Sequence, residues 1–334
     1  MKKSGCVIIV LFLAICASMF VNLVLCAALV GDSAGTGIKV AREKDFEEAF
    51  VQEGGSASDG KIVVIPLTGV IAHGTAGALG DDMVEDFKNA LDQAKKDSTV
   101  KAIVLSVDSP GGEITASDVL YHALKEFTAK SGKPSVVYFN SIGASGAYYT
   151  ACGSSYIMCN ATTFTGSIGV IISTLNYREL FGKLGLQSVV FKSGKFKDML
   201  NGAREMTPDE QAYIQGLVMQ SYDKFVGIVA KARGLDEQEL RNGIADGRIL
   251  SGTDALAAKL VNQLGYIEDA YAKAKELGKA PDAKVVRYKR VASFEKFFRM
   301  FGESKVPAIK VDVLEGLPKL EQGRVYLLPP FYAQ

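Results

Sequence analysis

Nearly continuous apolar runs in the middle of the chain constrain its fold most strongly. The runs at 61–65, 101–107 and 135–139 have the length and composition of strands that are buried on both faces. The alternation of such runs with helical patterns predicts an α/β fold with mainly parallel strands and flanking helices. The other expected helices and strands lie at 81–94, about 115 onward, 147–151, 156–159, 168–172, 176–184 and 188–191.

A complete helix start follows at Thr207. Thr207 suits the N-cap position, Pro208 the first turn, and Glu210 the position from which a side chain bonds back to the cap. Gly234 suits the C-terminal end of this helix. The sequence therefore predicts a helix of about 25 residues with one buried apolar stripe. The stripe consists of Ile214, Leu217, Val218, Phe225, Val226 and Val229.

A long uncharged segment begins close to the N-terminus. Lys2 and Lys3 precede 25 residues without a charge, at 6–30. As a helix this segment would measure roughly 37 Å, which exceeds the about 30 Å of a bilayer's hydrocarbon core. Because no clean cleavage site follows, we expect a transmembrane signal anchor, with the remainder of the chain on the extracytoplasmic side of the cell membrane. A cleaved export signal is the alternative.

The segments on either side of the α/β region divide the chain further. Residues 31–60 are polar and are expected to form a linker, with some helical character at 40–50. Residues 61–280 are expected to form the globular domain, and 281–334 a C-terminal extension whose role stays open. Between Lys284 and Lys305 the extension has seven basic and two acidic residues, which suits a solvated face or a membrane or partner contact. A net charge of +1 gives no indication of nucleic-acid binding.

The cysteines and histidines offer little for metal or triad chemistry. Three of the five cysteines lie in the N-terminal segment, and Cys152 and Cys159 are expected to be small buried residues, with a disulfide left open. No spacing resembles a zinc site, and we expect no metal and no cofactor. A Ser-His-Asp triad would need one of the two histidines. His122 lies in a helical pattern and His73 at a strand-to-loop change, and neither context supports that role.

Ser145 lies where the strand at 135–139 gives way to the helix at 147–151. It has only alanine and glycine beside it, so a substrate backbone can approach closely. A helix N-terminus offers free N–H groups to a developing oxyanion. The Asp-Ser-Pro-Gly-Gly loop at 108–112 also follows a buried strand, which places it at the same edge of a parallel sheet. Each stretch taken alone is equally an ordinary turn.

A general base is less evident from the residues themselves. Lys192, Lys195 and Lys197 lie in one polar loop. A free lysine side chain has a pKa of about 10.4, so a lysine acts as a base only where burial lowers that value to about 7–8. Composition does not choose among the three lysines.

Six motifs together resemble the signal peptide peptidase A family, the serine/lysine membrane-bound peptidases of bacteria and plastids. Their order and spacing agree with the family from about Lys61 to Tyr266, and the set is highly specific although each motif alone is weak. The resemblance implies a fold similar to that of Clp protease and crotonase. The motifs lie at 108–112, 143–149, 165–170, 193–198, 204–207 and 245–248.

The resemblance also implies roles for individual residues. The family's nucleophile falls on Ser145, and its general-base lysine falls on Lys197, 52 residues later. The serine that orients this lysine falls on Ser167. The oxyanion glycine falls on Gly112, with the N–H of Gly146 as the second donor. The short, single-copy form implies a homo-oligomeric ring in which neighbouring subunits build each site.

Three functional hypotheses follow. The leading one is a membrane-anchored serine endopeptidase with a Ser-Lys dyad, which cleaves apolar peptides such as leftover signal peptides, and with equal support other membrane or envelope proteins. The second is a crotonase-like acyl-CoA enzyme, for which Glu113 is the acid nearest the oxyanion loop. The third is a catalytically silent membrane scaffold. Ser145 and Lys197 at the family's spacing favour the peptidase.

Overall fold

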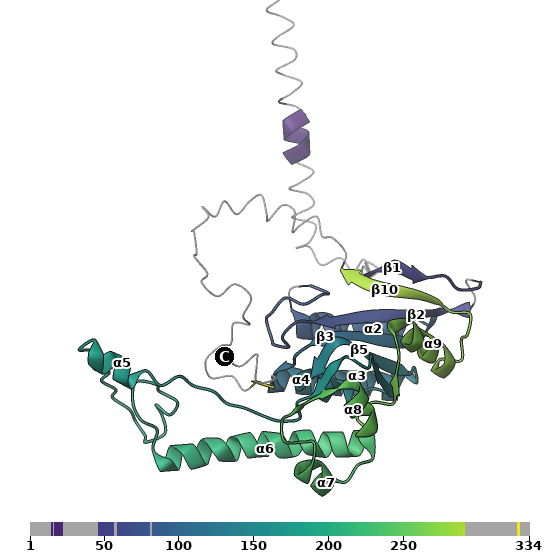
Figure 1. The fold of residues 1–334 in the computed structure, drawn as a ribbon. Helices are drawn as coiled ribbons and strands as arrows, with labels where there is room; N and C mark the ends of the chain where they lie inside the picture. Colours follow the sequence, from purple (N-terminus) through teal and green to yellow (C-terminus); the bar gives the residue numbers. More distant parts are fainter. Residues whose placement is uncertain are drawn as a thin grey trace, which may run out of the picture. The chain divides into compact units, whose positions relative to one another are not determined.

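A nine-stranded sheet lies at the centre of the unit Lys44–Gln334 in this computed structural model (Figure 1). The described residues are 15, 17–22, 46–56, 59–80, 82–290 and 326–327. The strands of the sheet are β1 (Phe46–Gln52), β2 (Lys61–Thr68), β3 (Val100–Ser109), β5 (Ser135–Ala144), β6 (Tyr156–Cys159), β7 (Phe164–Gly166), β8 (Ile249–Ser251), β9 (Gln263–Leu264) and β10 (Lys284–Arg290). A separate pair joins β4 (Gly112–Glu113) to β11 (Tyr326–Leu327).

The sheet is mainly parallel, as expected. Its order is β1-β10-β2-β3-β5-β6-β9, and β7 pairs with both β5 and β8. The β1–β10 and β7–β8 pairs are antiparallel, whereas the pairs from β10 through to β9 are parallel. The helices are α2 (Met83–Lys96), α3 (Ile114–Ser131), α4 (Gly146–Ala151), α5 (Arg178–Lys183), α6 (Pro208–Arg233), α7 (Glu237–Asn242), α8 (Gly252–Ala257) and α9 (Ile267–Leu277).

Alternate residues of the central strands point to opposite faces of the sheet and form two apolar cores. On one face Val63 and Ile65 of β2 join buried side chains of α2, α3, α4 and the second half of α6. On the other face Ile62 and Val64 join buried side chains of α9. All four are fully buried, which explains why these strands are nearly continuous apolar runs.

The folded region is wider than the domain expected at 61–280. Residues 46–52, expected in the linker with helical character, instead form β1, and residues 284–290 of the expected extension form β10. β1 pairs with β10, and β10 pairs with β2, so both flanks of the expected domain join the sheet. The rings of Phe46 and Tyr288 stack with centroids 5.9 Å apart and close this edge.

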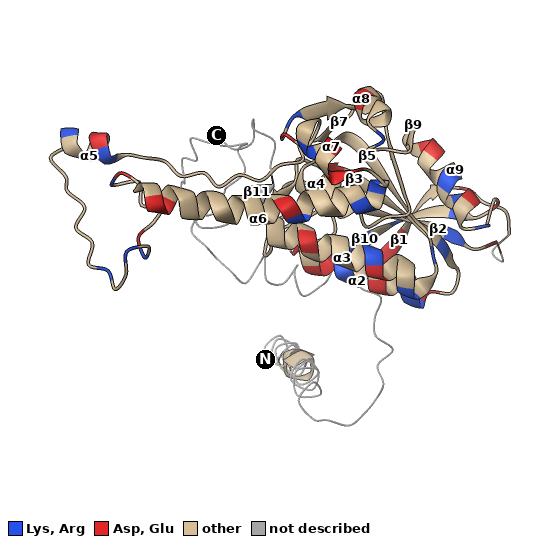
Figure 2. Ribbon diagram, turned by 90° about the horizontal axis from the view of Figure 1, so that it is seen from below, with Lys and Arg blue, Asp and Glu red and all other residues tan. Residues whose placement is uncertain are grey.

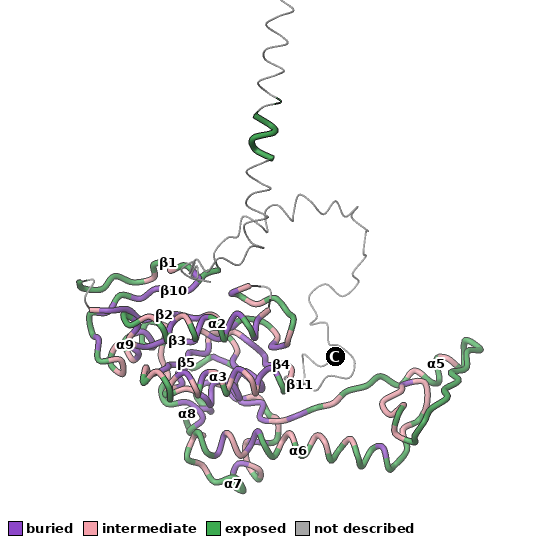
Figure 3. The backbone as a smooth tube through the Cα atoms, turned by 180° about the vertical axis from the view of Figure 1, so that it is seen from behind, coloured by how far each residue is buried: buried purple, intermediate pink, exposed green. Residues whose placement is uncertain are grey.

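Residues 171–207 form an arm that projects from the sheet (Figures 1 and 3). The strand expected at 168–172 does not form, because β7 ends at Gly166 and the chain turns there with positive φ at Gly166 and Ser167. The strand expected at 188–191 is also wrong. That segment lies on the arm, where the described residues offer it no neighbouring strand, and Phe191 is 96% exposed.

Helix α6 joins the arm to the rest of the unit. The expected capping box is present, with Glu210 Oε2 accepting from Thr207 N at 2.8 Å, and Gly234 ends the helix with a left-handed φ of 65°. The expected apolar stripe is only half covered. Phe225, Val226 and Val229 are buried, whereas Ile214, Leu217 and Val218 in the first half are intermediate.

The N-terminal unit, Met1–Glu43, is described at residues 15 and 17–22, which are helical and exposed. Among the described residues, no helix has the length and apolar character needed to cross a bilayer. The anchor expected at 6–30 lies mostly outside the described residues.

Candidate active site

Ser145 sits at a strained turn between β5 and α4. Its φ of 55° and ψ of −117° lie outside the regions that a serine ordinarily adopts. Ser145 N donates to the Gly166 carbonyl oxygen at 2.8 Å, and the Ser145 carbonyl accepts from Tyr149 N at 2.8 Å. The residue is fully buried, and its hydroxyl has no hydrogen-bond partner among the described residues. Strained turns that carry an uncommitted hydroxyl are typical of nucleophilic serines.

Three neighbouring residues hold this turn in place. Asp108 Oδ1 accepts from Ile142 N at 3.1 Å, and Thr165 Oγ1 donates to the Gly143 carbonyl at 2.6 Å. A Cβ on Gly143 would lie 2.0 Å from the Phe139 ring, so no larger residue fits there without movement. Asp108 and Thr165 lie within the family motifs, but the motifs alone gave neither a role because these contacts link three separate strands.

Strand β4, which begins at Gly112, lies beside helix α4. Ile71 N donates to the Gly111 carbonyl at 2.8 Å, and Glu113 N donates to the Ile71 carbonyl at 2.7 Å. Because successive residues of a strand direct their polar groups to opposite edges, the N–H of Gly112 points away from Ile71. A Cβ at this glycine would lie 2.0 Å from the Ile71 oxygen. β4 contacts α4, which brings Gly112 and Gly146 to the neighbourhood of Ser145.

The edge of β4 that faces away from Ile71 pairs with another extended segment of the chain, β11. Leu327 of β11 pairs with Gly112, and Tyr326 pairs with Glu113, in antiparallel register. The edge that points away from Ile71 is therefore able to bind a polypeptide backbone.

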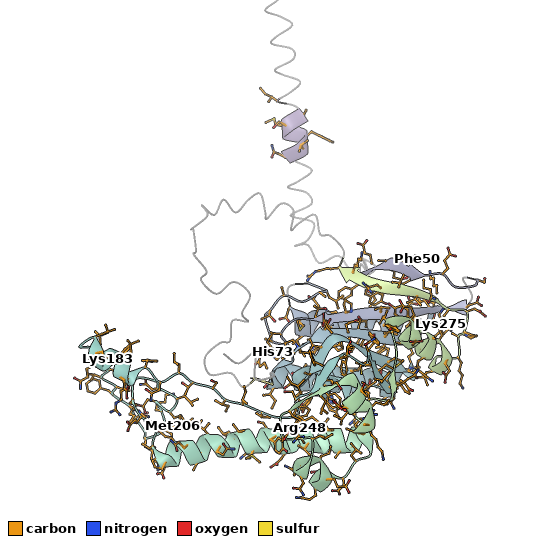
Figure 4. All side chains as sticks on the ribbon, in the orientation of Figure 1. Phe50, His73, Lys183, Met206, Arg248 and Lys275 are labelled. Carbon is orange, nitrogen blue, oxygen red and sulfur yellow. The ribbon has the colours of Figure 1, made fainter. Side chains whose placement is uncertain are left out.

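Ser167 is close to the turn as well. It is nearly fully buried, has a φ of 50°, and follows Gly166, whose carbonyl accepts from Ser145 N. Ser167 N donates to the carbonyl of Arg248, which is labelled in Figure 4, at 2.8 Å. The structure thus brings together four of the five expected site residues, namely Ser145, Ser167, Gly112 and Gly146.

Lys197, the fifth, lies elsewhere, on the arm marked by Lys183 and Met206 in Figure 4. It is exposed, and its ammonium has no partner among the described residues. The other two lysines of the loop are paired: Lys192 Nζ lies 2.7 Å from Asp198 Oδ1, and Lys195 Nζ lies 3.0 Å from Asp209 Oδ2. Lys197 is therefore the uncommitted lysine of the loop, but a single chain does not place it against Ser145.

The histidines and cysteines do not enter the site. His122 is exposed on α3 beside Glu126, and His73 Nδ1 lies 3.4 Å from Glu113 Oε2. Neither bonds to the Ser145 hydroxyl, for which the described ranges offer no partner. Cys152 and Cys159 are buried and free, and burial raises the pKa of each thiol to about 12, so both are protonated and unreactive at neutral pH.

A strained, buried serine at a strand-to-helix turn, beside glycine N–H groups and a strand edge that accepts an extended backbone, defines the site of a serine hydrolase that acts on peptides. The comparisons with known proteins give the family. The model of peptidase family S49 matches residues 128–280. A putative signal peptide peptidase SppA of Enterococcus faecium is 40% identical over 248 residues, which cover 73% of this chain and 71% of that protein. The chain belongs to peptidase family S49 and is a serine protease.

A second sequence relative agrees with this membership. A putative protease of Methanocaldococcus jannaschii is 36% identical over 247 residues, which cover 72% of this chain and 77% of that protein. Among solved structures, the 1510-N membrane-bound stomatin-specific protease matches with a TM-score of 0.40 and 17% identity, over 65% of this chain and 84% of that chain. The sequence relatives favour the peptidase over both the acyl-CoA enzyme and the silent scaffold.

Proposed function

We propose that the protein is a membrane-anchored serine endopeptidase in which Ser145 is the nucleophile and Lys197 of a neighbouring copy is the general base. One observation carries the proposal: within the part of the chain that the structure describes, the buried Ser145 hydroxyl has no partner, and neither has the exposed Lys197 ammonium on the apolar arm. Each group lacks what the other supplies.

The proposed chemistry is acyl transfer. Lys197 Nζ, in its neutral form, takes the hydroxyl proton of Ser145 as Oγ adds to the peptide carbonyl carbon. The N–H groups of Gly112 and Gly146 stabilise the resulting oxyanion, and Ser167 holds the lysine. Collapse of the intermediate breaks the C–N bond, and the amine leaves with the proton from the lysine. A water molecule then repeats the sequence on the acyl-enzyme and releases Ser145.

The proposed substrates are extended apolar peptides, such as leftover signal peptides. The pairing of Tyr326 and Leu327 with β4 supports this class, because it shows a backbone bound beside Gly112 in the way that a substrate strand would be. The name of the Enterococcus faecium relative, a putative signal peptide peptidase, points to the same class.

The arm supports assembly with further copies of the chain into a ring. Its large apolar side chains are exposed, and the first half of α6 leaves its apolar stripe half-exposed. Apolar surface of this extent marks an interaction site. The exposed residues are Leu175, Leu180, Leu184, Leu186, Val189, Val190 and Phe191.

Membrane attachment through 6–30 is part of the proposal. The segment has no charge, and within it Met19, Phe20 and Val21 are exposed on a helical stretch. Such a helix would place the protease domain on the extracytoplasmic side. Alkaline extraction of membranes tests it: the full chain should stay in the membrane fraction, and release into the supernatant would exclude the anchor.

Subunit mixing tests the shared site. Ser145→Ala and Lys197→Ala chains should each be inactive on an apolar fluorogenic peptide, and co-assembly of the two should restore part of the activity. The matched control mixes Ser145→Ala chains with chains that carry both substitutions, and this mixture should stay inactive. Full activity of Lys197→Ala alone would exclude the lysine as base, and inactivity of every mixture would exclude a site shared between copies.

A further inference from the structure

We propose that Arg204 is a positioning residue, which ties the turn that carries Lys197 to the first turn of α6 and so fixes where the lysine is presented. The inference rests on the proposed function, because it takes Lys197 as the base. It assigns to Arg204, Asp198 and Glu210 a common task outside the site around Ser145.

Arg204 makes a double fork between two carboxylates. Its Nε and Nη2 donate to Asp198 Oδ2 and Oδ1 at 2.8 and 2.7 Å, and its Nη1 and Nη2 donate to Glu210 Oε2 and Oε1 at 2.9 and 2.5 Å. The Asp198 and Glu210 side chains are only 10% and 3% exposed. Planar guanidinium is suited to such bidentate pairing, whereas a lysine ammonium is not.

The two carboxylates belong to different elements. Asp198 directly follows Lys197 in the turn, and its backbone carbonyl also accepts from Arg204 Nη2 at 3.1 Å. Glu210 lies in the first turn of α6, where it accepts from Thr207 N as part of the capping box. Figure 2 shows the acidic residues at the arm end of this helix. Arg204 therefore connects the lysine turn to a helix whose other end is buried in the core.

Electrostatics agrees with this connection. The Arg204 guanidinium holds the pKa of the Asp198 carboxyl well below its usual range and lowers that of Glu210 to about 2, so both remain charged at neutral pH. Without Arg204, the Asp198 carboxylate would keep only Lys192 as a cationic partner, and more of its negative charge would act on the adjacent Lys197. An adjacent negative charge favours the protonated lysine, which is useless as a base. The charged groups around the turn are Lys192, Lys195, Asp198, Arg204, Glu205, Asp209, Glu210 and Arg178.

The turn should shift rather than unfold when Arg204 is removed. Phe196 stacks on Tyr213 of α6 with ring centroids 5.3 Å apart, and Lys195 pairs with Asp209, so two other contacts hold the turn near the helix. A displaced but folded turn is the condition under which positioning and folding can be told apart.

The chain offers a matched control in Arg241. Arg241 also pairs with two carboxylates, those of Asp223 on α6 and Glu237 on α7, at 2.7 and 3.5 Å. Its side chain is 24% exposed, against 29% for Arg204. It contacts the second half of α6, away from the lysine turn, so its loss removes an arginine that bridges two carboxylates without touching that turn.

The experiment measures kcat and KM on an apolar fluorogenic peptide between pH 6 and 10, with the assembled full chain. Arg204→Ala should lower kcat by about 10- to 100-fold, as expected for a displaced catalytic group, while KM changes less than about 3-fold. The pH profile should move upward by up to about one pH unit, because the Asp198 charge, then balanced by Lys192 alone, favours the protonated form of Lys197. Arg204→Lys should recover part of kcat, and Arg241→Ala should match the parent.

Two results would overturn the inference. One is a parent-like Arg204→Ala, and the other is a loss confined to KM or shared equally by Arg241→Ala. Lys197→Ala, assayed alongside, separates this failure from failure of the proposed function. If Lys197→Ala keeps its activity, the base is misassigned. If Lys197→Ala is inactive while Arg204→Ala matches the parent, only the positioning role is wrong.

Discussion

The sheet region and the arm treat their apolar residues in opposite ways. In the sheet, Leu105 and Phe139 are fully buried between layers of the same chain. On the arm, Leu175 is 77% exposed and Phe191 is 96% exposed, and Figure 3 shows most of the arm as exposed or intermediate. The sheet region completes its own core, whereas the arm leaves its apolar side chains exposed and would form half of the proposed interface.

The polar groups differ in the same sense. Among the described residues, the buried hydroxyl of Ser145 in the sheet region and the exposed ammonium of Lys197 on the arm both have no partner. A buried polar group without a partner costs stability, so its presence calls for a functional explanation. The difference teaches that one chain carries both parts of the proposed site, the nucleophile Ser145 in the sheet region and the base Lys197 on the arm.

The largest expected effect is on the sheet side of the site. Ser145→Ala should lower peptide cleavage by at least about 10³-fold, because loss of a nucleophilic serine removes the covalent route. Fluorogenic peptide cleavage and fluorophosphonate labelling measure it. Ser141→Ala, at an exposed position of the same strand, is the control and should match the parent. Equal labelling of Ser145→Ala and the parent would show that another residue is the nucleophile.

On the arm, the next effect concerns assembly. Phe191→Asp should abolish the oligomer and lower activity by about 100-fold or more, because the charge lies in the proposed interface and the base is then misplaced. Light scattering after size-exclusion chromatography measures the mass. Phe50→Asp replaces another exposed phenylalanine, on edge strand β1, and should leave the mass unchanged. An intact oligomer of Phe191→Asp would remove the arm from the interface.

Stability should separate the two regions at matched residues. Leu105→Ala in β3 should lower the free energy of unfolding by about 2–5 kcal/mol, because it leaves a cavity in the core. Leu175→Ala on the arm should change it by less than about 0.5 kcal/mol, because its side chain is exposed. Urea unfolding in the dissociated Phe191→Asp background gives both values. Equal losses at the two positions would mean that the arm packs on its own chain.

The smallest effect is the response of the arm to acid. The pKa of Glu210 is lowered from 4.5 to about 2 by hydrogen bonds from Arg204 and Thr207. Its contribution to the order of the lysine turn is therefore fully present above about pH 4.5 and is lost as the pH falls toward about 2. Hydrogen exchange of peptides spanning 192–210, corrected for the intrinsic rate, should show protection declining over that range. In Glu210→Gln the decline should be smaller, because only Asp198 of the two Arg204 partners still titrates; an identical decline would assign it to other carboxyls.

Sequence patterns predicted correctly those helices and strands that are determined by residues adjacent in the sequence. The capping box at Thr207 and Glu210 and the buried runs of β2 and β3 follow from adjacent residues, and the structure confirms them. The pairing of β1 with β10 was missed, because its stabilisation comes from residues more than 230 positions apart in the sequence. The apolar run at 188–191 predicted a strand, but composition does not reveal that this segment lies exposed on the arm, away from the sheet.

The site residues also differ in how far the sequence predicted their positions. Ser145 and Gly112 lie at one edge of the sheet, where adjacent parallel strands end, and Ser167 follows the neighbouring strand β7; their catalytic roles stay predictions. The choice of Lys197 over Lys192 and Lys195 had rested on resemblance, and the structure adds a physical reason, since only the other two have carboxylate partners among the described residues. The role of Lys197 itself stays a prediction, because a single chain does not bring it to a serine.

Helix α6 has one further consequence. Its 26 residues form an uninterrupted rod of about 39 Å, with one end fixed in the core and the other at the lysine turn. The length of α6 therefore sets the distance between the sheet of a chain and the turn that carries its Lys197, and in the proposed assembly this distance decides whether Lys197 reaches a neighbouring Ser145. One residue added to the middle of the rod would turn the tip by about 100° and lengthen it by about 1.5 Å, so the length of this helix, more than its sequence, should be intolerant of change.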